Sequence, residues 1–132
     1  MNSRIVHFEI HAADPERAKT FYHDVFGWDF PEWMQEPPYW GVMTAPAGSQ
    51  EPGINGGLLI RRGEPPKEGA AVNAFVCTVQ VDAYDEVHER ILGAGGSVAL
   101  PKMAIPGMAW QGYYKDTEGN IFGVHQADAN AK

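Results

Sequence analysis

Cysteine is almost absent from this chain: Cys77 is the only one among 132 residues, which excludes an internal disulfide. Basic residues are also few, with 10 lysines and arginines against 17 acidic residues and a net charge of −7. This acidic balance argues against nucleic acid or an anionic membrane as a partner. The sequence has no apolar run as long as a membrane span and no signal peptide, so we expect a cytoplasmic protein.

What the chain does contain is a repeated pattern. Residues 5–12 have the character of a strand, and an amphipathic segment then begins at Asp14 and ends at Gly27. About half the chain later, a strand-like run at 75–81 is followed by a second helical segment that begins at Asp82 and ends in the glycines of 93–96. Each half closes with a further strand, at 54–60 and 120–126. Two copies of one strand–helix–strands unit predict a pseudo-symmetric α+β domain, and ligand sites often form between such halves.

The helix boundaries follow from local chemistry. Asp14 is a good N-cap, Pro15 suits the first turn, and Gly27 is a typical stop. One apolar stripe with helical spacing, which we expect to be buried, is formed by Ala18, Phe21, Tyr22, Val25 and Phe26. In the second helix the expected cap is Asp82 and the expected stripe is Tyr84, Val87, Ile91 and Leu92.

The domain prediction is one domain over 1–128 with a frayed tail at 129–132. Module one covers about 1–62, a proline-containing linker covers about 61–69, and module two covers about 70–128. Further strands are predicted at 28–33, 39–45, 97–100 and 109–115, and the segment 102–108 is predicted to be a loop.

Strand alternation separates two faces. Phe8, Ile10 and Ala12 form the apolar set that should pack on the helix, and the alternate residues His7, Glu9 and His11 should face away from it. In the other half the apolar set is Phe75, Cys77, Val79 and Val81, with Val76, Thr78 and Gln80 on the opposite face. Both first strands therefore predict a comparatively polar face, and a curved sheet would turn these two faces into a shared cleft.

The sequence resembles the vicinal oxygen chelate superfamily, which includes glyoxalase I, extradiol dioxygenases, and fosfomycin and bleomycin resistance proteins. The resemblance rests on residues 7–10, 14–18, 21–22 and 25–28, together with Gly95-Gly96 and 115–120. It implies two βαβββ modules that form an open, barrel-like sheet with a central cavity, and it implies a homodimer. One fold of this kind hosts many activities.

In metal-dependent members of that superfamily, the ligands come from the first and last strands of each module. The matching positions here are His7, Gly57, Val76 and Gly123. Glycine has no side chain and valine no donor atom, so the usual set of nitrogen and oxygen ligands cannot form. We therefore predict no metal at this position, and no cofactor.

Three interpretations of the polar cluster His7, Glu9 and His11 stay open. It is an atypical metal site, a hydrogen-bonded polar wall, or a metal-free acid–base site in which Glu9 takes a proton and a histidine orients it. Neighbours two apart along a strand are roughly 6.5–7 Å apart, so chelation needs converging side chains. Around the cluster we predict a ligand site that also contains Thr78, Gln80, His125, Trp33, Trp40 and Trp110.

The function predicted from these observations is that of a glyoxalase/bleomycin-resistance-like protein that binds a small molecule between its modules without the usual metal. One alternative is a lyase or isomerase-type enzyme that uses Glu9 with His7 or His11. Whether the chain is an enzyme stays open, but proton transfer is favoured over dioxygenase chemistry. Another alternative is an antibiotic-sequestering protein, since an acidic chain with several aromatic residues suits a cationic, planar drug.

Overall fold

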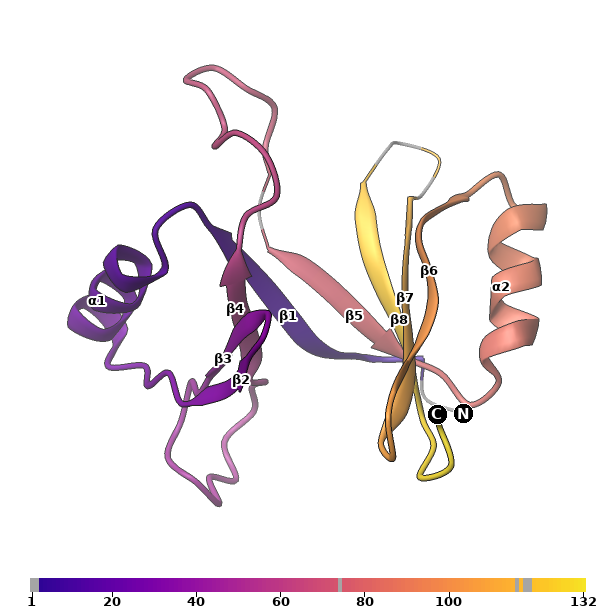
Figure 1. Ribbon diagram of the computed structural model, residues 1–132, viewed down its shortest axis with the longest axis horizontal. Coiled ribbons are helices and arrows are strands. Elements are labelled where there is room, and N and C mark those ends of the chain that lie inside the picture. Colours follow the sequence, from indigo (N-terminus) through magenta and orange to yellow (C-terminus); the bar gives the residue numbers. More distant parts are fainter. Residues whose placement is uncertain (1–2, 74, 116, 118–119) are drawn as a thin grey trace. The chain divides into compact units, whose positions relative to one another are not determined.

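The computed structural model describes residues 3–73, 75–115, 117 and 120–132. Ala74, next to the strand predicted at 75–81, and Asp116, Glu118 and Gly119, in the resemblance motif, lie outside the described residues. In chain order the elements are β1 (Ile5–Ala12), α1 (Pro15–Phe26), β2 (Glu32–Gln35), β3 (Pro38–Val42), β4 (Gly56–Ile60), β5 (Val76–Gln80), α2 (Tyr84–Gly93), β6 (Ser97–Ile105), β7 (Ala109–Lys115) and β8 (Ile121–Ala127). Twice the order is strand, helix, three strands, which confirms an α+β fold built from two βαβββ modules (Figure 1).

The chain forms two compact units. The first unit is His7–Phe75, and the second is Val76–Lys132 together with the residues up to Val6. In the first unit the strands lie in the order β2-β3-β4-β1, with β1 parallel to β4 and β3 antiparallel to β4. In the second unit the order is β5-β8-β7-β6, with β5 parallel to β8 and β7 antiparallel to β8.

Strand register identifies equivalent positions in the two units. Glu9 on β1 is opposite Gly57 on β4, and Thr78 on β5 is opposite Gly123 on β8. Glu9 therefore corresponds to Thr78, and Gly57 to Gly123. Since each first strand also leads into a helix, the internal repeat predicted from the sequence is present in the fold.

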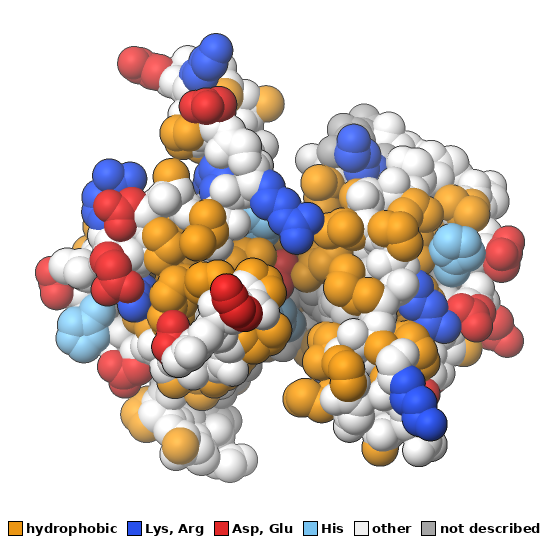
Figure 2. Space-filling model, viewed as in Figure 1, with side chains coloured by type: hydrophobic (Ala, Val, Ile, Leu, Met, Phe, Trp, Pro, Cys, Tyr) orange, Lys and Arg blue, Asp and Glu red, His pale blue; other side chains and the backbone are white. Residues whose placement is uncertain are grey.

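Helix α1 begins and ends as predicted. The Asp14 carboxylate accepts a hydrogen bond from the backbone N–H of Arg17 at 3.1 Å, and Gly27 takes the left-handed conformation, with φ of 76°. The expected buried stripe is wrong, however. Phe21, Val25 and Phe26 are 56%, 55% and 58% exposed, because the helix packs on its sheet through few side chains, and no residue of α1 is buried. Figure 2 shows hydrophobic side chains at the surface of this unit.

Helix α2 differs from the sequence prediction at its start. The N-cap is Ala83 rather than Asp82, and no side chain caps the helix from that position. Instead, the side-chain oxygen of Gln126 on β8 accepts a hydrogen bond from the backbone N–H of Tyr84 at 2.6 Å. A distant strand thus satisfies a helix end that local sequence usually satisfies. The helix packs on the core of the second unit, formed by Val81, Tyr84, Tyr114 and Val124.

Two further segments depart from prediction. Strand β6 continues to Ile105 because β7 pairs with it as far as the Ile105–Ala109 register, so the predicted loop at 102–108 is wrong over 102–105. The tail at 129–132, which the sequence predicts to be frayed, contacts the rest of its unit. The backbone N–H of Gly107 donates to the Ala131 carbonyl at 2.8 Å, and Ala131 is 3% exposed. Among the described residues, no helix is long and apolar enough to span a membrane.

Candidate functional site

The two faces of β1 are as different as the sequence predicts. Phe8 packs against Trp28, with ring centroids 6.3 Å apart, and Trp28 in turn stacks on Tyr22 of α1 at 5.3 Å. The face that carries Phe8 is therefore the helix side. Residues that alternate with Phe8 point away from α1, and among these Glu9 is only 6% exposed. A buried carboxylate needs hydrogen-bond partners, and these identify the rest of the site.

One partner of Glu9 is Tyr39 on β3. The Tyr39 hydroxyl donates to Glu9 Oε2 at 2.8 Å, and the same hydroxyl lies 2.9 Å from His7 Nε2. A phenol has one hydrogen, and here it is given to the carboxylate, so His7 Nε2 must be the donor to Tyr39. The result is a chain of hydrogen bonds that runs from His7 through Tyr39 to Glu9. His11 lies half-buried on the same strand face but outside this chain.

Gly57 is the reason that Tyr39 can reach Glu9. Strand β4 lies between β3 and β1, so these two strands are roughly 10 Å apart. A Cβ atom added at Gly57 would overlap the Tyr39 hydroxyl and ring. The absent side chain thus provides the space through which Tyr39 crosses the middle strand.

The second unit repeats this arrangement with different residues. Gln111 on β7 crosses β8 above Gly123, and its Nε2 donates to Thr78 Oγ1 at 3.4 Å. Gln111 Oε1 accepts from His125 Nδ1 at 2.8 Å. A Cβ at Gly123 would overlap Thr78 Oγ1 and would lie 2.8 Å from Gln111 Nε2. Thr78 and Gln111 are 2% and 8% exposed. The two networks differ in charge, since the first ends on a carboxylate and the second on a neutral hydroxyl.

These contacts bear on the four positions that the resemblance assigns to a metal. At Gly57 and Gly123, the place of a ligand side chain is filled by Tyr39 and by the Thr78–Gln111 pair, respectively. Within the described part of the chain, no three His, Cys, Asp or Glu side chains are grouped as a metal would require. The arrangement suits hydrogen bonding rather than metal coordination.

Both histidines of β1 are held towards their neutral forms. Burial lowers the pKa of His7 below the ordinary value of 6.5, and the nearby Glu9 partly opposes this shift. Burial also lowers the pKa of His11; Glu9 opposes it, and Arg61 and Arg62 add to it. A neutral His7 that donates through Nε2 keeps Nδ1 as an acceptor.

The aromatic residues predicted for the ligand site are divided between the two sheet faces. Trp33 on β2 lies beside the network: it stacks on Tyr39 with ring centroids 6.2 Å apart and is 52% exposed. Trp40 instead lies on the helix side, where Lys19 Nζ of α1 is 4.7 Å from its ring centroid.

Trp110 in the second unit likewise packs against the core beneath α2, and its indole N–H donates to Asp128 at 2.9 Å. Trp40 and Trp110 therefore lie on the helix side of their sheets, away from the two hydrogen-bond networks. Sequence analysis did not assign Tyr39 and Gln111 to the site. The glycines of the neighbouring strands were the available signal, since a glycine inside a strand often marks a close approach.

Gln80 is exposed at the end of β5, and its backbone N–H donates to the Arg4 carbonyl at 2.9 Å. Thr78 and His125 are joined through Gln111, as described above. The structure thus links His7 with Glu9 in the first unit and Thr78 with His125 in the second.

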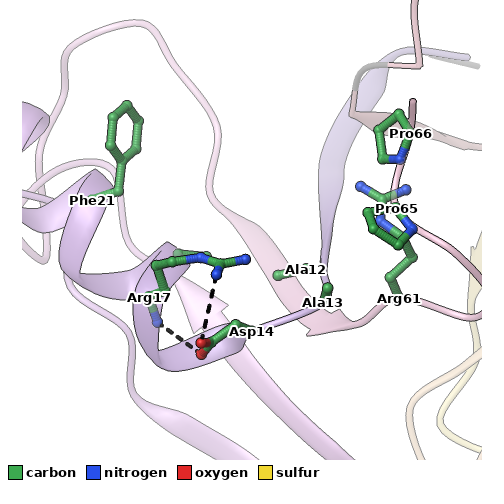
Figure 3. A pocket seen from close by; sticks show the side chains of 9 residues that line it. Ala12, Ala13, Asp14, Arg17, Phe21, Arg61, Pro65 and Pro66 are labelled. Atoms are coloured by element: carbon green, nitrogen blue, oxygen red, sulfur yellow. Dashed lines mark hydrogen bonds and ion pairs between the residues drawn. The ribbon is translucent and has the colours of Figure 1, made fainter. Parts of the chain in front are cut away.

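A separate surface pocket of about 380 Å³ lies at the start of α1 (Figure 3). Its lining includes Phe21, Pro65 and two arginines. Arg17 faces Asp14 at 4.0 Å, and Arg61 donates to the His11 carbonyl at 2.9 Å, so both guanidinium groups are already engaged. None of the site residues predicted from the sequence lines this pocket.

Comparisons with known proteins agree with this fold. The family model described as bleomycin resistance protein-like N-terminal matches residues 4–45. No curated protein matches the chain significantly in sequence. A glyoxalase/bleomycin resistance protein/dioxygenase superfamily member from Vibrio splendidus is similar in structure, with a TM-score of 0.63, 15% identity, and coverage of 95% of this chain and 98% of that one.

Methylmalonyl-CoA epimerases are also similar in structure. The enzyme from Mycobacterium tuberculosis has a TM-score of 0.61 and 17% identity, with 96% of this chain and 89% of that chain covered. The enzyme from Streptomyces coelicolor, in complex with 2-nitronate-propionyl-CoA, has a TM-score of 0.63 and 17% identity, with 100% and 99% covered. Such low identities show the fold alone. The family match is confined to residues 4–45, and the structural similarity shows that this chain shares the fold of these proteins.

Proposed function

We propose that this chain binds a small organic molecule on the polar sheet face that carries His7 and Glu9, without the usual metal. The observation that carries the proposal is the position of the Tyr39 hydroxyl, which fills the space of a ligand side chain at Gly57. His7 and His11 would contact the ligand through half-buried rings, and Trp33 would offer an exposed aromatic surface beside them. Thr78 and His125 are the matching candidates in the second unit.

Binding is tested on protein purified without added metal. Elemental analysis should find no stoichiometric transition metal, and native mass spectrometry identifies any retained small molecule. Isothermal titration of that molecule should give at least tenfold weaker binding for Glu9→Gln, which keeps the side-chain shape and removes the charge. Glu32→Gln, on the exposed strand β2 of the same unit, is the matched control and should bind normally.

Two results would count against this function. One is a stoichiometric metal that is lost in His7→Ala. The other is equal binding by Glu9→Gln and the native protein. Bleomycin, titrated in the same way, tests the antibiotic-sequestering alternative, which is supported by the net charge of −7 and by the N-terminal family match.

A second candidate function is metal-free proton transfer of the isomerase or lyase type. The observation that favours it is that Glu9 is a buried carboxylate oriented by Tyr39, close to a neutral histidine. A group placed in this way suits abstraction of a proton next to a carbonyl. The structural similarity to methylmalonyl-CoA epimerases makes methylmalonyl-CoA the first substrate to try.

The test of proton transfer is exchange in D₂O. Loss of the α-proton signal of methylmalonyl-CoA, followed by proton NMR, should be accelerated by the native protein and not by Glu9→Gln. Equal rates with and without protein would exclude this substrate. Equal acceleration by Glu9→Gln would exclude Glu9 as the base.

We also propose a cytoplasmic location.

We further propose that the chain is a homodimer. Support for the dimer comes from α1, where Phe21, Val25 and Phe26 leave more than half of each side chain exposed. Exposed apolar groups gathered on one helix favour association, and two-fold dimers are the commonest assemblies. Light scattering should give twice the mass of 14.5 kDa, and Phe26→Glu should reduce it to the monomer mass. A monomeric native protein would refute the proposal.

A further inference from the structure

We propose that Tyr39 is the positioning residue of this site: its hydroxyl joins His7 and Glu9 by hydrogen bonds, and the missing side chain at Gly57 leaves the space that this hydroxyl occupies. This inference deepens the proposed function and rests on it, because it concerns how the same site presents its groups to a ligand. Tyr39 itself acts through His7 and Glu9, by fixing which atoms of each are turned towards the hydroxyl.

Tyr39 has to reach across a whole strand to meet Glu9. Glu9 and Tyr39 belong to strands that are not neighbours, since β4 separates them. Any side chain at position 57 would occupy the space in which the hydroxyl of Tyr39 now lies. The hydrogen bond between Tyr39 and Glu9 therefore depends on both Tyr39 and Gly57, because neither residue would allow it without the other.

The hydrogen bonds of the Tyr39 hydroxyl have a fixed direction. Tyr39 gives its single hydrogen to Glu9 Oε2, so it can only accept from His7 Nε2. His7 is thereby held with a proton on Nε2 and, in its neutral form, with an acceptor at Nδ1. A ligand that approaches His7 must accordingly offer a hydrogen-bond donor, such as a hydroxyl, an amide N–H or an ammonium group.

The second unit contains an equivalent contact across a glycine. By strand register, Tyr39 is opposite Leu59 two residues beyond Gly57, and Gln111 is opposite His125 two residues beyond Gly123. Gln111 is thus the counterpart of Tyr39, and it too reaches across a glycine to the first strand of its unit. A chance contact would not be expected at equivalent positions twice.

The test uses ligand-free protein labelled with ¹⁵N-histidine. In the native protein the Nε2–H proton of His7 should give an observable NMR signal, because the hydrogen bond to Tyr39 slows its exchange with water. Tyr39→Phe should lose this signal, with exchange at least tenfold faster. Tyr22→Phe removes a hydroxyl on the helix side of the same unit and, as the matched control, should leave the signal unchanged.

Gly57→Ala provides the second measurement. With Tyr39 present, the new methyl group should displace the ring and abolish the same signal. In a Tyr39→Ala background, Gly57→Ala should cause little further loss of thermal stability, because the space is then empty. A His7 signal that survives in Tyr39→Phe, or equal costs of Gly57→Ala in the two backgrounds, would overturn the inference.

The ligand measurements separate this inference from the proposed function. If Tyr39→Phe loses the His7 signal and weakens binding of the retained molecule at least threefold, Tyr39 positions the site. If the signal is lost but binding is unchanged, the positioning role is refuted while small-molecule binding stands. If Glu9→Gln has no effect on binding, the proposed function fails, whatever the NMR signal shows.

Discussion

Tyr39 donates a hydrogen bond of 2.8 Å to Glu9, although the whole of strand β4 lies between the strands that carry them. This contact depends on Gly57, and its counterpart between Gln111 and Thr78 crosses β8 at Gly123. The two units therefore use glycines in their last strands to let longer side chains meet the first strand. At both glycines, hydrogen-bonded side chains occupy the space that a side chain at that position would fill.

Gly123→Ala should destabilise the protein by about 2 kcal/mol, because the added methyl group would overlap the buried Thr78 and force side chains out of their rotamers. Urea unfolding measures this loss. Gly93→Ala at the end of α2 is the matched control. Apart from its chain neighbours and the backbone of its own helix, an added Cβ there meets no described atom within 4 Å, so the change should be neutral or stabilising by up to about 1 kcal/mol. Similar losses for the two variants would contradict the overlap seen at Gly123.

Glu9→Gln should lower the pKa of both His7 and His11. In the native protein the negative charge of Glu9 raises both values against the effect of burial, and the amide removes that charge while burial remains. NMR titration of the histidine ring protons measures both values. Glu32→Gln should leave them unchanged, and a rise in either pKa in Glu9→Gln would show that the charge does not act as described.

Stability should fall on acidification through the range just below pH 6.5, the ordinary histidine pKa. The folded-state pKa values of His7 and His11 are lowered, so between those values and 6.5 the unfolded chain binds more protons than the folded one. Stability then rises with pH across that window and levels off above it. Urea unfolding from about pH 7.5 to about pH 5 tests this, and His11→Gln should flatten the slope. A native protein that gains stability on acidification would reverse the predicted sign.

Gln126→Ala should destabilise the protein by about 1–2 kcal/mol, because it leaves the Tyr84 backbone N–H at the start of α2 without its acceptor. Asp14→Ala removes the cap of α1 and should cost about 1 kcal/mol, which makes it a useful reference. Thermal unfolding compares the two variants with the native protein. A Gln126→Ala variant as stable as the native protein would contradict the capping of α2 from β8.

Local chemistry in the sequence determined much of the fold. The bounds of β1, the capping of α1 by Asp14 and the left-handed stop at Gly27 agree with prediction, because each depends on residues within a few positions of one another. The alternation along β1 also predicted correctly that Glu9 lies on the face opposite the helix. The period of a strand is fixed by its backbone, so this face could be assigned without knowing the neighbouring strands.

Only the tertiary structure determines which side chains contact Glu9. Whether Tyr39 or Trp40 shares its face depends on the register between β3 and β4, and a shift of one residue would exchange them. The same holds for Gln126, which caps α2 from β8, and for the strand partner that extends β6 over a segment predicted to be a loop. The sequence supplied Glu9, Tyr39 and Gly57 at separations of 18 to 48 residues, and only the pairing of strands brought them within hydrogen-bond distance.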